Sequence, residues 1–315
     1  MSSNPLDDKK GKPIRAMFAD YDGTLCSASA ARDESLGQNR ISPKIKQTLQ
    51  QISQRIPLCI ISSKDYFFLR ETQSFAKVIS CLMGIETLSF DDSNAVAEQQ
   101  SQPPPFHRKL LLDEGRLSDP SDALEEIAEN IESDPEFRSI LVERKHTSDG
   151  RILAGITIDW RRTKNWDYYK KGVQHFVSAA VTNLSQPPKP VNLYVQKYEH
   201  HPFVDVYAVE CSKGTAFDMV LSEIRADRDG GGKNDHRKNI IICAEDVLYL
   251  GDSENDNPAF RKAGISIGIR SDARLKPKLD CSYFLNYEAL SSFLTGLMKN
   301  DCMFMERLIV GGDKA

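Results

Sequence analysis

The segment that decides the fold is residues 14–24, which reads IRAMFADYDGT. Its apolar part, Ile14 to Ala19, predicts a buried strand, and the acids Asp20 and Asp22 follow at its end. Because side chains alternate along an extended chain, the two carboxylates point the same way, and Gly23 then allows a sharp exit from the strand. The pattern predicts a strand that directs two acids at one point.

Apolar runs and amphipathic segments alternate on both sides of this strand. The predicted elements are a helix that begins at Ser42 and Pro43 and ends at Pro57, a strand at 58–61, a helix-compatible stretch at 65–75, a helix at 213–224, strands at 247–250 and 265–269, and a helix at 287–299. Alternation of strands and helices indicates a parallel α/β sheet. We therefore expect a Rossmann-like, doubly wound parallel sheet as the core.

The middle of the chain departs from this alternation. Residues 91–105 are rich in Asp, Ser, Gln and Pro and read as a linker, so we place a domain junction after residue 91. The elements expected beyond it are a helix from Ser121, a hairpin of 140–144 and 152–160, a helix at 166–184, and extended runs at 191–195 and 203–209. The predicted domains are a discontinuous core at 14–91 and 209–300, an inserted α+β domain at 92–208, and tails at 1–13 and 301–315. The Gly-rich loop 227–238 is predicted to be a surface excursion.

Composition excludes several classes of protein. Apolar residues make up 40% of the 315 residues and charged residues 27%, with a mean hydropathy of -0.44, as in ordinary globular chains. A net charge of -4 gives no general attraction to nucleic acid or to an anionic membrane. The sequence has no apolar run of membrane-spanning length and no signal-peptide core in its first 13 residues, so we expect a cytoplasmic protein, a monomer or weak homodimer. Seven cysteines without a C-x-x-C pair predict reduced, packed thiols.

Acidic side chains follow two of the predicted strands, and a hydroxyl follows a third. In an open parallel sheet, reactive groups gather beyond the carboxyl ends of the strands, and here those ends carry Asp20, Ser62 and Asp252. Together with Asp22 and Asp256 they predict a cluster of carboxylates, which repel one another unless a cation lies between them. Hard oxygen ligands suit Mg²⁺, so we expect the four acids to form a magnesium site.

Three further side chains favour phosphate. Thr24 and Ser62 carry hydroxyls that could hold phosphate oxygens, and Lys213 opens a helix, where its charge and the helix dipole both attract an anion. Singly, each of these residues has a simpler explanation, since Asp is common at turns and helix caps and a surface Lys is normally solvated. The combination favours a phosphate site.

The motifs together resemble those of the haloacid dehalogenase-superfamily phosphatases. The segment Asp20–Thr24 matches D-x-D-G-T, Ser62 and Lys213 match the hydroxyl and lysine motifs, and Gly251–Asp256 matches G-D-x-x-x-D, in the family's order. The resemblance covers roughly 14–91 and 209–300. It implies that Asp20 attacks phosphorus to form an aspartyl-phosphate and that Asp22 is the general acid and base. It also implies that Mg²⁺ is held by Asp20, Asp252 and the main-chain carbonyl of Asp22, while Ser62 and Lys213 share the phosphoryl charge.

The insertion resembles the C2-type, C2B-like α/β cap that this superfamily uses to cover sugar phosphates. Glu143 and Lys145 as E-x-K, Arg161 at the end of a strand, and the pair Lys213-Gly214 resemble trehalose-6-phosphate phosphatases. Glu143, Lys145 and Arg161 are suited to sugar hydroxyls, but a cross-strand ion-pair ladder explains them equally well.

The expected function is therefore hydrolysis of a phosphorylated sugar with Mg²⁺. Trehalose 6-phosphate is the first expected substrate, and glucosyl- or mannosyl-phosphoglycerate, sucrose phosphate and hexose phosphates are alternatives. A phosphomutase of the same superfamily is a further alternative. A dehalogenase is disfavoured because that branch lacks an acid at the position of Asp22, and a silent binding protein is disfavoured because every catalytic position is filled.

Overall fold

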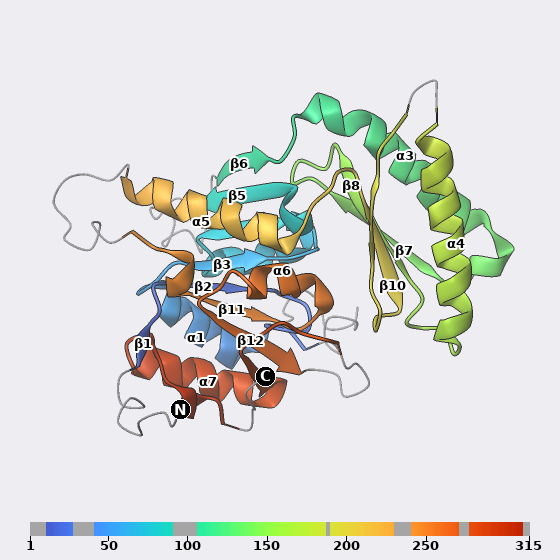
Figure 1. Ribbon diagram of the computed structural model, residues 1–315. Coiled ribbons are helices and arrows are strands. Elements are labelled where there is room, and N and C mark those ends of the chain that lie inside the picture. Colours follow the sequence, from blue (N-terminus) through green and yellow to red (C-terminus); the bar gives the residue numbers. More distant parts are fainter. Residues whose placement is uncertain are drawn as a thin grey trace, which may run out of the picture.

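The computed structural model describes residues 11–27, 41–90, 106–186, 190–229, 241–270 and 277–310. The predicted linker at 91–105 and most of the predicted loop at 227–238 lie outside these residues. Figure 1 shows two layered units side by side, a large sheet with helices on both faces and a smaller sheet covered by two helices. We call the first unit the core and the second unit the cap.

The large sheet carries the site and is mostly parallel. Its strands are β2 (Ala16–Ala19), β3 (Leu58–Ile61), β4 (Val78–Cys81), β5 (Glu86–Phe90), β6 (Phe106–Leu110), β11 (Val247–Gly251), β12 (Ile265–Arg270) and β13 (Tyr283–Asn286). Their order is β13-β12-β11-β2-β3-β4-β5-β6, and the pairings from β13 to β4 are parallel. The pairs β4–β5 and β5–β6 are antiparallel. The expected parallel sheet is thus confirmed, apart from the reversed strand β5.

Helices cover both faces of this sheet, as the alternation in the sequence predicts. They are α1 (Pro43–Ser53), α2 (Tyr66–Leu69), α5 (Lys213–Asp229), α6 (Asn257–Phe260) and α7 (Tyr287–Lys299). Figure 1 shows α1 and α7 on one face and α5 and α6 on the other. Along β2, Met17 and Ala19 belong to the apolar cluster that includes α1 and α7, whereas Ala16 and Phe18 belong to the cluster that includes α5. The predicted doubly wound core is confirmed.

The segment after the predicted junction differs from expectation. Strand β6 falls within 92–208, which the sequence assigned to the insertion, yet it is the edge strand of the large sheet and pairs with β5. Its side chains alternate between partly buried and exposed, so no apolar run marked it as a strand. At the other end, β1 (Lys12–Pro13) pairs with β14 (Met303–Phe304), so parts of the two predicted tails lie together.

The cap is an antiparallel sheet with two helices on one face. Its strands are β7 (Leu141–His146), β8 (Leu153–Asp159), β9 (Tyr194–Lys197) and β10 (Phe203–Tyr207), in the order β7-β8-β10-β9. The helices are α3 (Glu114–Ser133) and α4 (Trp166–Leu184), and they lie on the far side of the sheet from the core (Figure 1). The predicted hairpin and the predicted helix at 166–184 are confirmed. Helix α3 begins before the predicted start at Ser121, because Asp113 caps it and Pro120 is accommodated inside it.

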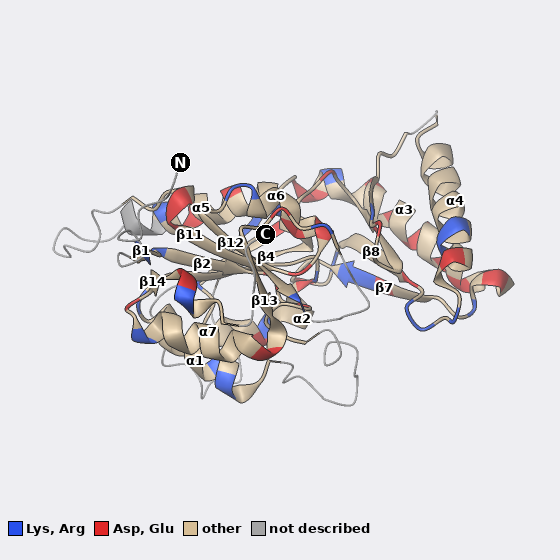
Figure 2. Cartoon of the chain, turned by 60° about the horizontal axis from the view of Figure 1, so that its bottom comes forward, with Lys and Arg blue, Asp and Glu red and all other residues tan. Residues whose placement is uncertain are grey.

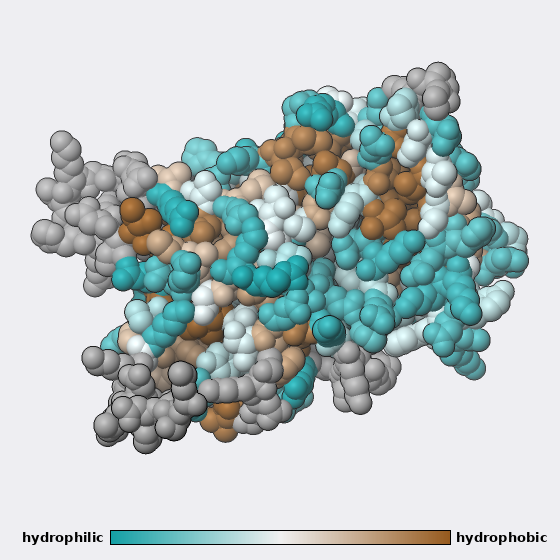
Figure 3. Space-filling view, in the orientation of Figure 1, coloured by the Kyte–Doolittle hydropathy of each residue, from teal (hydrophilic) through white to brown (hydrophobic). Residues whose placement is uncertain are grey.

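The surface and the cysteines agree with a globular chain. In Figure 3, hydrophobic residues reach the face in view only as patches between hydrophilic ones. All seven cysteines are free thiols and six of them are buried, as predicted, while Cys243 is exposed. Among the described residues, no helix combines the length and the apolarity that crossing a bilayer requires.

The cap is attached to the core through a buried acid. Glu86 of β5 is fully buried, and its carboxylate accepts hydrogen bonds from the main-chain N–H and the hydroxyl of Ser148, in the turn of the β7–β8 hairpin, at 2.9 and 2.7 Å. Arg108 donates to the same carboxylate at 2.6 Å and also contacts Glu114 and Asp149. The hairpin turn of the cap is therefore held on the edge of the large sheet.

This attachment predicts a large loss of stability for one variant. Glu86→Ala leaves Arg108 and the N–H of Ser148 without their buried acceptor, so we expect the free energy of unfolding to fall by about 3–5 kcal/mol in a urea titration. Glu114→Gln removes a partly exposed member of the same cluster and should cost about 1 kcal/mol or less. Equal effects of the two substitutions would contradict the role given to Glu86.

Candidate active site

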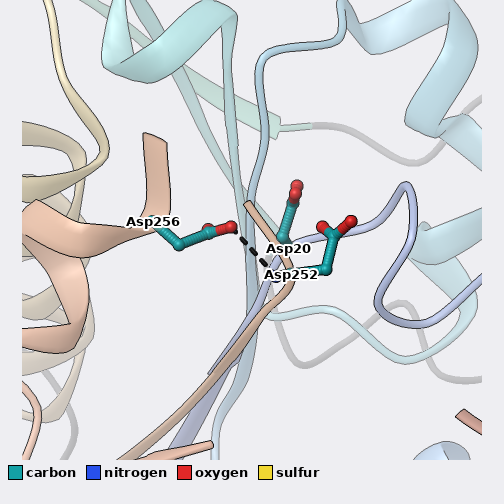
Figure 4. Close-up of side chains that lie close together, drawn as sticks. All are labelled: Asp20, Asp252 and Asp256. Carbon is teal, nitrogen blue, oxygen red and sulfur yellow. Dashed lines mark hydrogen bonds between the residues drawn. The ribbon is translucent and has the colours of Figure 1, made fainter. Parts of the chain in front are cut away.

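Three predicted site residues meet at one edge of the large sheet. Asp20 follows β2, Ser62 follows β3 and Asp252 follows β11, and β2 is the strand between the other two. The N–H of Asp20 donates to the carbonyl of Leu250 at 2.9 Å, which extends the pairing of β2 and β11 up to the site. In Figure 4 the carboxylates of Asp20 and Asp252 lie side by side. The sheet topology therefore brings together the residues that the motifs predicted.

A glycine allows the two loops to approach each other. Gly23 has a φ of 78°, and a Cβ at this position would lie 1.9 Å from Oδ2 of Asp252. The neighbouring Thr24 is fully buried and its hydroxyl donates to Oδ1 of Asp252 at 3.3 Å. The contact found for Thr24 thus orients Asp252, and the predicted contact with phosphate stays a prediction.

Lys213 is buried between two carboxylates. It is the first residue of α5, and its Nζ lies 2.7 Å from Oδ2 of Asp20 and 2.7 Å from Oδ1 of Asp256. Burial by itself disfavours the ammonium, but the two neighbouring carboxylates outweigh this effect and raise the pKa of Lys213 above its ordinary value. Lys213 is therefore a permanent positive charge beside Asp20.

Asp256 differs from the other acids, because its oxygens are already occupied. Oδ1 accepts hydrogen bonds from Lys213 and from the hydroxyl of Tyr249, each at 2.7 Å. Oδ2 accepts from the N–H of Asp252 at 3.1 Å and from the N–H and hydroxyl of Ser253 at 3.0 and 3.3 Å. Figure 4 shows the contact between the N–H of Asp252 and Asp256. These contacts position Lys213 and the loop after β11, and the predicted role of Asp256 as a metal ligand stays a prediction.

Asp20 and Asp252 retain the capacity to bind a cation. Oδ1 of Asp20 is buried and has no hydrogen-bond partner among the described residues. Burial, reinforced by the charges of Asp256 and Asp22, raises the pKa of Asp20 to about 7 in spite of Lys213, and burial and Asp20 raise the pKa of Asp252. Oxygens of Asp20, Asp252 and Asp256 lie within 4.8 Å of one another. A divalent cation between Asp20 and Asp252 would use the unpaired oxygen and offset the repulsion between the acids.

Ser62 lies at the end of β3, as predicted, and its hydroxyl contacts the main chain. It is 1% exposed, and its hydroxyl oxygen accepts a hydrogen bond from the N–H of Lys64 at 3.3 Å. The next residue, Ser63, lines the cavity at the site. The predicted role of Ser62 in phosphate binding stays a prediction.

Lys64 is a site residue that the sequence analysis missed. Its Nζ lies 2.8 and 2.7 Å from the two carboxylate oxygens of Glu143 in the cap and 3.6 Å from Oδ2 of Asp22 in the core. The available signal was its place in the loop after β3, two residues beyond Ser62. A lysine that closely follows a motif residue at the end of a strand is therefore a candidate site residue that the sequence could have indicated.

The cap residues close the site from the other side. A cavity of about 90 Å³ lies between the two sheets. Side chains that line it include Asp20, Asp22, Lys64, Asp252 and Asn255 from the core and Lys145, Arg161, His201, Phe203 and Asp205 from the cap. Figure 2 shows basic residues along the part of β7 that faces the core. The predicted cap residues and the core motifs therefore share one site.

Each predicted cap residue has a charged partner in the structure. Glu143 binds Lys64, and although burial opposes ionisation, Lys64 and other nearby cations lower the pKa of Glu143 to about 2. Lys145 is 1% exposed and donates to Asp205 on β10 at 3.1 Å. Arg161 donates to Asp159 at 2.7 Å. All three residues are thus ion-paired, but not as the cross-strand ladder on an exposed face, because none of the pairs joins adjacent strands and Lys145 is buried. Their binding to a sugar belongs to the proposal below.

A second contact between cap and core was also missed. The hydroxyl of Tyr198 donates to Asp205 at 2.7 Å and accepts from Nδ2 of Asn255 at 3.3 Å, so the loop after β11 is linked to the cap. His201 is 6% exposed and packs against the rings of Tyr198 and Phe203. The position of Asn255 inside the fourth motif was the one signal that the sequence contained for this contact.

Comparison with known proteins finds similarity in structure alone. No protein-family model matches the sequence, and no curated protein matches it. The C-terminal domain of the trehalose-6-phosphate phosphatase of C. albicans is 16% identical with a TM-score of 0.56, covering 94% of this chain and 96% of that one. The trehalose-6-phosphate phosphatase of Aspergillus fumigatus is 18% identical with a TM-score of 0.50, covering 91% and 94%.

A bacterial structure extends the same similarity. A haloacid dehalogenase-like hydrolase of Bacteroides thetaiotaomicron is 13% identical with a TM-score of 0.53, covering 91% of this chain and 99% of that one. These structures match nearly the whole chain, the core and the cap together. At such identities they establish the fold, which the motifs of the core had indicated. The chain has the fold of the haloacid dehalogenase-superfamily phosphatases.

Proposed function

We propose that this protein is a Mg²⁺-dependent phosphatase that hydrolyses a phosphorylated sugar through an aspartyl-phosphate. The observation that carries the proposal is the environment of Asp20, a buried carboxylate whose Oδ2 is held by Lys213 and which lines one cavity with Asp22 and Asp252. An oriented carboxylate oxygen in an enclosed site suits nucleophilic attack on phosphorus. The similar structures, which include trehalose-6-phosphate phosphatases, support the same reaction.

The reaction divides between two acids. A carboxylate oxygen of Asp20 forms a bond to phosphorus as the ester P–O bond breaks, and Asp22 gives its proton to the departing alcohol oxygen. Asp22 then takes a proton from water, and the water oxygen attacks phosphorus, which restores Asp20 and releases inorganic phosphate. Lys213 stays charged throughout and offsets the charge of the phosphoryl oxygens. Asp256 keeps Lys213 in place.

Mg²⁺ fits the donor set of this site. Asp20, Asp252 and the main-chain carbonyl of Asp22 would hold it, because Asp20 has a buried oxygen that no described residue binds and Asp252 lies beside it. A bound Mg²⁺ neutralises charge on the phosphoryl oxygens and orients the phosphate. Asp256 positions this set rather than joining it, because its oxygens are occupied by five donors.

The cap supports a neutral, polyhydroxylated leaving group. Lys145, Arg161 and Asp205 of the cap line the cavity, where Lys145 is bound to Asp205 and Arg161 is bound to Asp159 behind the lining. Alternating donors and acceptors match hydroxyl groups, which both donate and accept. Trehalose 6-phosphate is our first candidate, followed by phosphoglycerates of sugars, sucrose phosphate and hexose phosphates. The cavity of about 90 Å³ is partly open to solvent and smaller than usual ligand pockets of about 300 Å³ or more, so we expect the cap to move when any of these binds.

The nucleophile gives the first functional prediction. Asp20→Asn keeps the shape of the side chain and removes the attacking charge, so turnover should fall by more than about a thousandfold while the circular dichroism and thermal unfolding stay native-like. Asp280→Asn, an exposed acid paired with Arg261, is the matched control and should keep wild-type turnover. A folded Asp20→Asn protein with normal phosphate release would disprove this mechanism.

The proposed metal site gives the second functional prediction. Asp252→Asn removes a proposed ligand, so the Mg²⁺ concentration for half-maximal activity should rise at least about tenfold, and Mg²⁺ binding measured by calorimetry should weaken in parallel. Asp256→Asn disturbs Lys213 instead and should lower kcat with a smaller change in Mg²⁺ binding. If both variants lose Mg²⁺ affinity equally, Asp256 is a ligand after all. Chelation by EDTA should abolish wild-type activity and added Mg²⁺ should restore it.

The substrate is tested by phosphate release from a panel of sugar phosphates, which also separates a phosphatase from a phosphomutase. Arg161→Ala should lower kcat/KM for the best panel member by about 10- to 200-fold, the effect of losing a polar contact to a substrate hydroxyl. Hydrolysis of p-nitrophenyl phosphate, which has no sugar, should change little. Equal losses on both substrates would mean that Arg161 supports the structure rather than the sugar.

A further inference from the structure

One lysine is shared between the two units. The Nζ of Lys64 lies 2.8 and 2.7 Å from the carboxylate oxygens of Glu143 in the cap and 3.6 Å from Oδ2 of Asp22 in the core. The side chain of Lys64 is only 13% exposed and lines the cavity. Asp22, an acid of the proposed reaction, and Glu143, an acid of the cap, are thus both paired with the ammonium of Lys64.

The main chain around this lysine is fixed. The N–H of Lys64 donates to the hydroxyl oxygen of Ser62 at 3.3 Å, and its carbonyl accepts from the N–H of Leu82 at 3.0 Å. Because both backbone groups are bonded, movement is confined to the flexible side chain, whose Nζ lies 4.7 Å from the centre of the Phe68 ring. The ammonium can therefore shift between Glu143 and Asp22 without any change in the core fold.

Other cations of the cavity have acids of their own. Lys145 is bound to Asp205 and Arg161 to Asp159, at 3.1 and 2.7 Å. Neither has an ion pair with Glu143 or Asp22 within the part of the chain that the structure describes, whereas Lys64 has both. Lys64 is thus the cation through which the cap contacts the acid.

In the present arrangement Asp22 is paired with Lys64 by charge but receives no hydrogen bond from it. Its Oδ1 is buried and has no hydrogen-bond partner among the described residues, and its Oδ2 is beyond hydrogen-bond distance of Nζ. Glu143 binds the ammonium with both oxygens and holds it at this distance. If the cap moves away, Lys64 loses that partner, and the other carboxylate with which its ammonium is paired is Asp22, at 3.6 Å.

We infer that Lys64 is a positioning residue that couples docking of the cap to the availability of Asp22. With the cap docked, Glu143 holds Lys64 and Asp22 is free to transfer protons; with the cap away, Lys64 binds Asp22 and blocks the transfer. The inference rests on the proposed function, because it uses Asp22 as the general acid and base. Since the cavity is smaller than usual ligand pockets, we expect the cap to move when substrate enters, and the coupling would then operate in every turnover.

The test is a double-mutant cycle of Glu143→Gln and Lys64→Met, measured with p-nitrophenyl phosphate, which has no sugar for the cap to bind. Glu143→Gln should lower kcat about tenfold with KM nearly unchanged, because Lys64 then binds Asp22; this is less than the loss of about 100-fold or more from removing a general acid. Lys64→Met in the wild type should also lower kcat, because Glu143 and Asp22 then repel each other.

The decisive result is whether Lys64→Met raises or lowers kcat when it is added to Glu143→Gln. Added to Glu143→Gln, Lys64→Met should raise kcat severalfold, because the charge that sequesters Asp22 is gone. Lys64→Arg should retain most of the wild-type kcat, since a guanidinium can bind both oxygens of Glu143 and so be held away from Asp22. Arg144→Gln is the matched control on the same strand; its partners Glu125 and Glu132 belong to α3, so kcat should be unchanged.

Several outcomes of these experiments would contradict the inference. An unchanged kcat in Glu143→Gln, additive losses in the double variant, or a rise in KM for p-nitrophenyl phosphate would overturn the inference, the last by showing that Lys64 binds substrate directly. If Lys64→Met does not fold, Lys64→Gln removes the same charge and takes its place in the cycle. A wild-type protein that releases no phosphate from any substrate would refute the proposed function itself, whereas an active one with additive losses would refute this inference alone.

Discussion

The ammonium of Lys213 is the charge around which the site is organised. It is completely removed from water, so it depends on Asp20 on one side and Asp256 on the other. Asp256 in turn accepts the main-chain N–H groups of Asp252 and Ser253, so one buried acid holds both the lysine and the loop that carries the next carboxylate. The geometry of Asp20 and Asp252 follows from this network, because a break in it would leave a buried charge without a partner.

Contacts between core and cap differ in how firmly they hold. Glu86 is fully buried and binds the hairpin turn of the cap together with Arg108, so its bonds cannot be exchanged for water without a large penalty. The pair of Lys64 and Glu143 is partly exposed and lies at the cavity. A firm attachment at the sheet edge and an exchangeable one at the site are consistent with a cap that opens without leaving the core.

Several helices and strands could be predicted from local patterns, because capping residues and apolar spacing are local signals. The helices at 166–184 and 287–299 have the expected ends, whereas the helix starting at Pro43 ends at Ser53, before the predicted end at Pro57. Strands β4, β5, β6 and β13 of the large sheet were not predicted, and the domain junction was placed before β6. The edge strand β6 carries no continuous apolar run, and its partner is chosen by the neighbouring strand rather than by its own side chains.

The sequence was sufficient to group Asp20, Asp22, Lys213 and Asp252, because strands of a parallel sheet end at a common edge and the motifs mark those ends. It was not sufficient to say what each group contacts. That Asp256 is saturated by five donors, and that Lys64 lies between Glu143 and Asp22, depends on distances of a few ångströms between segments far apart in the chain. Hydrogen bonds and ion pairs form only within such distances, so packing of the cap on the core decided those partners.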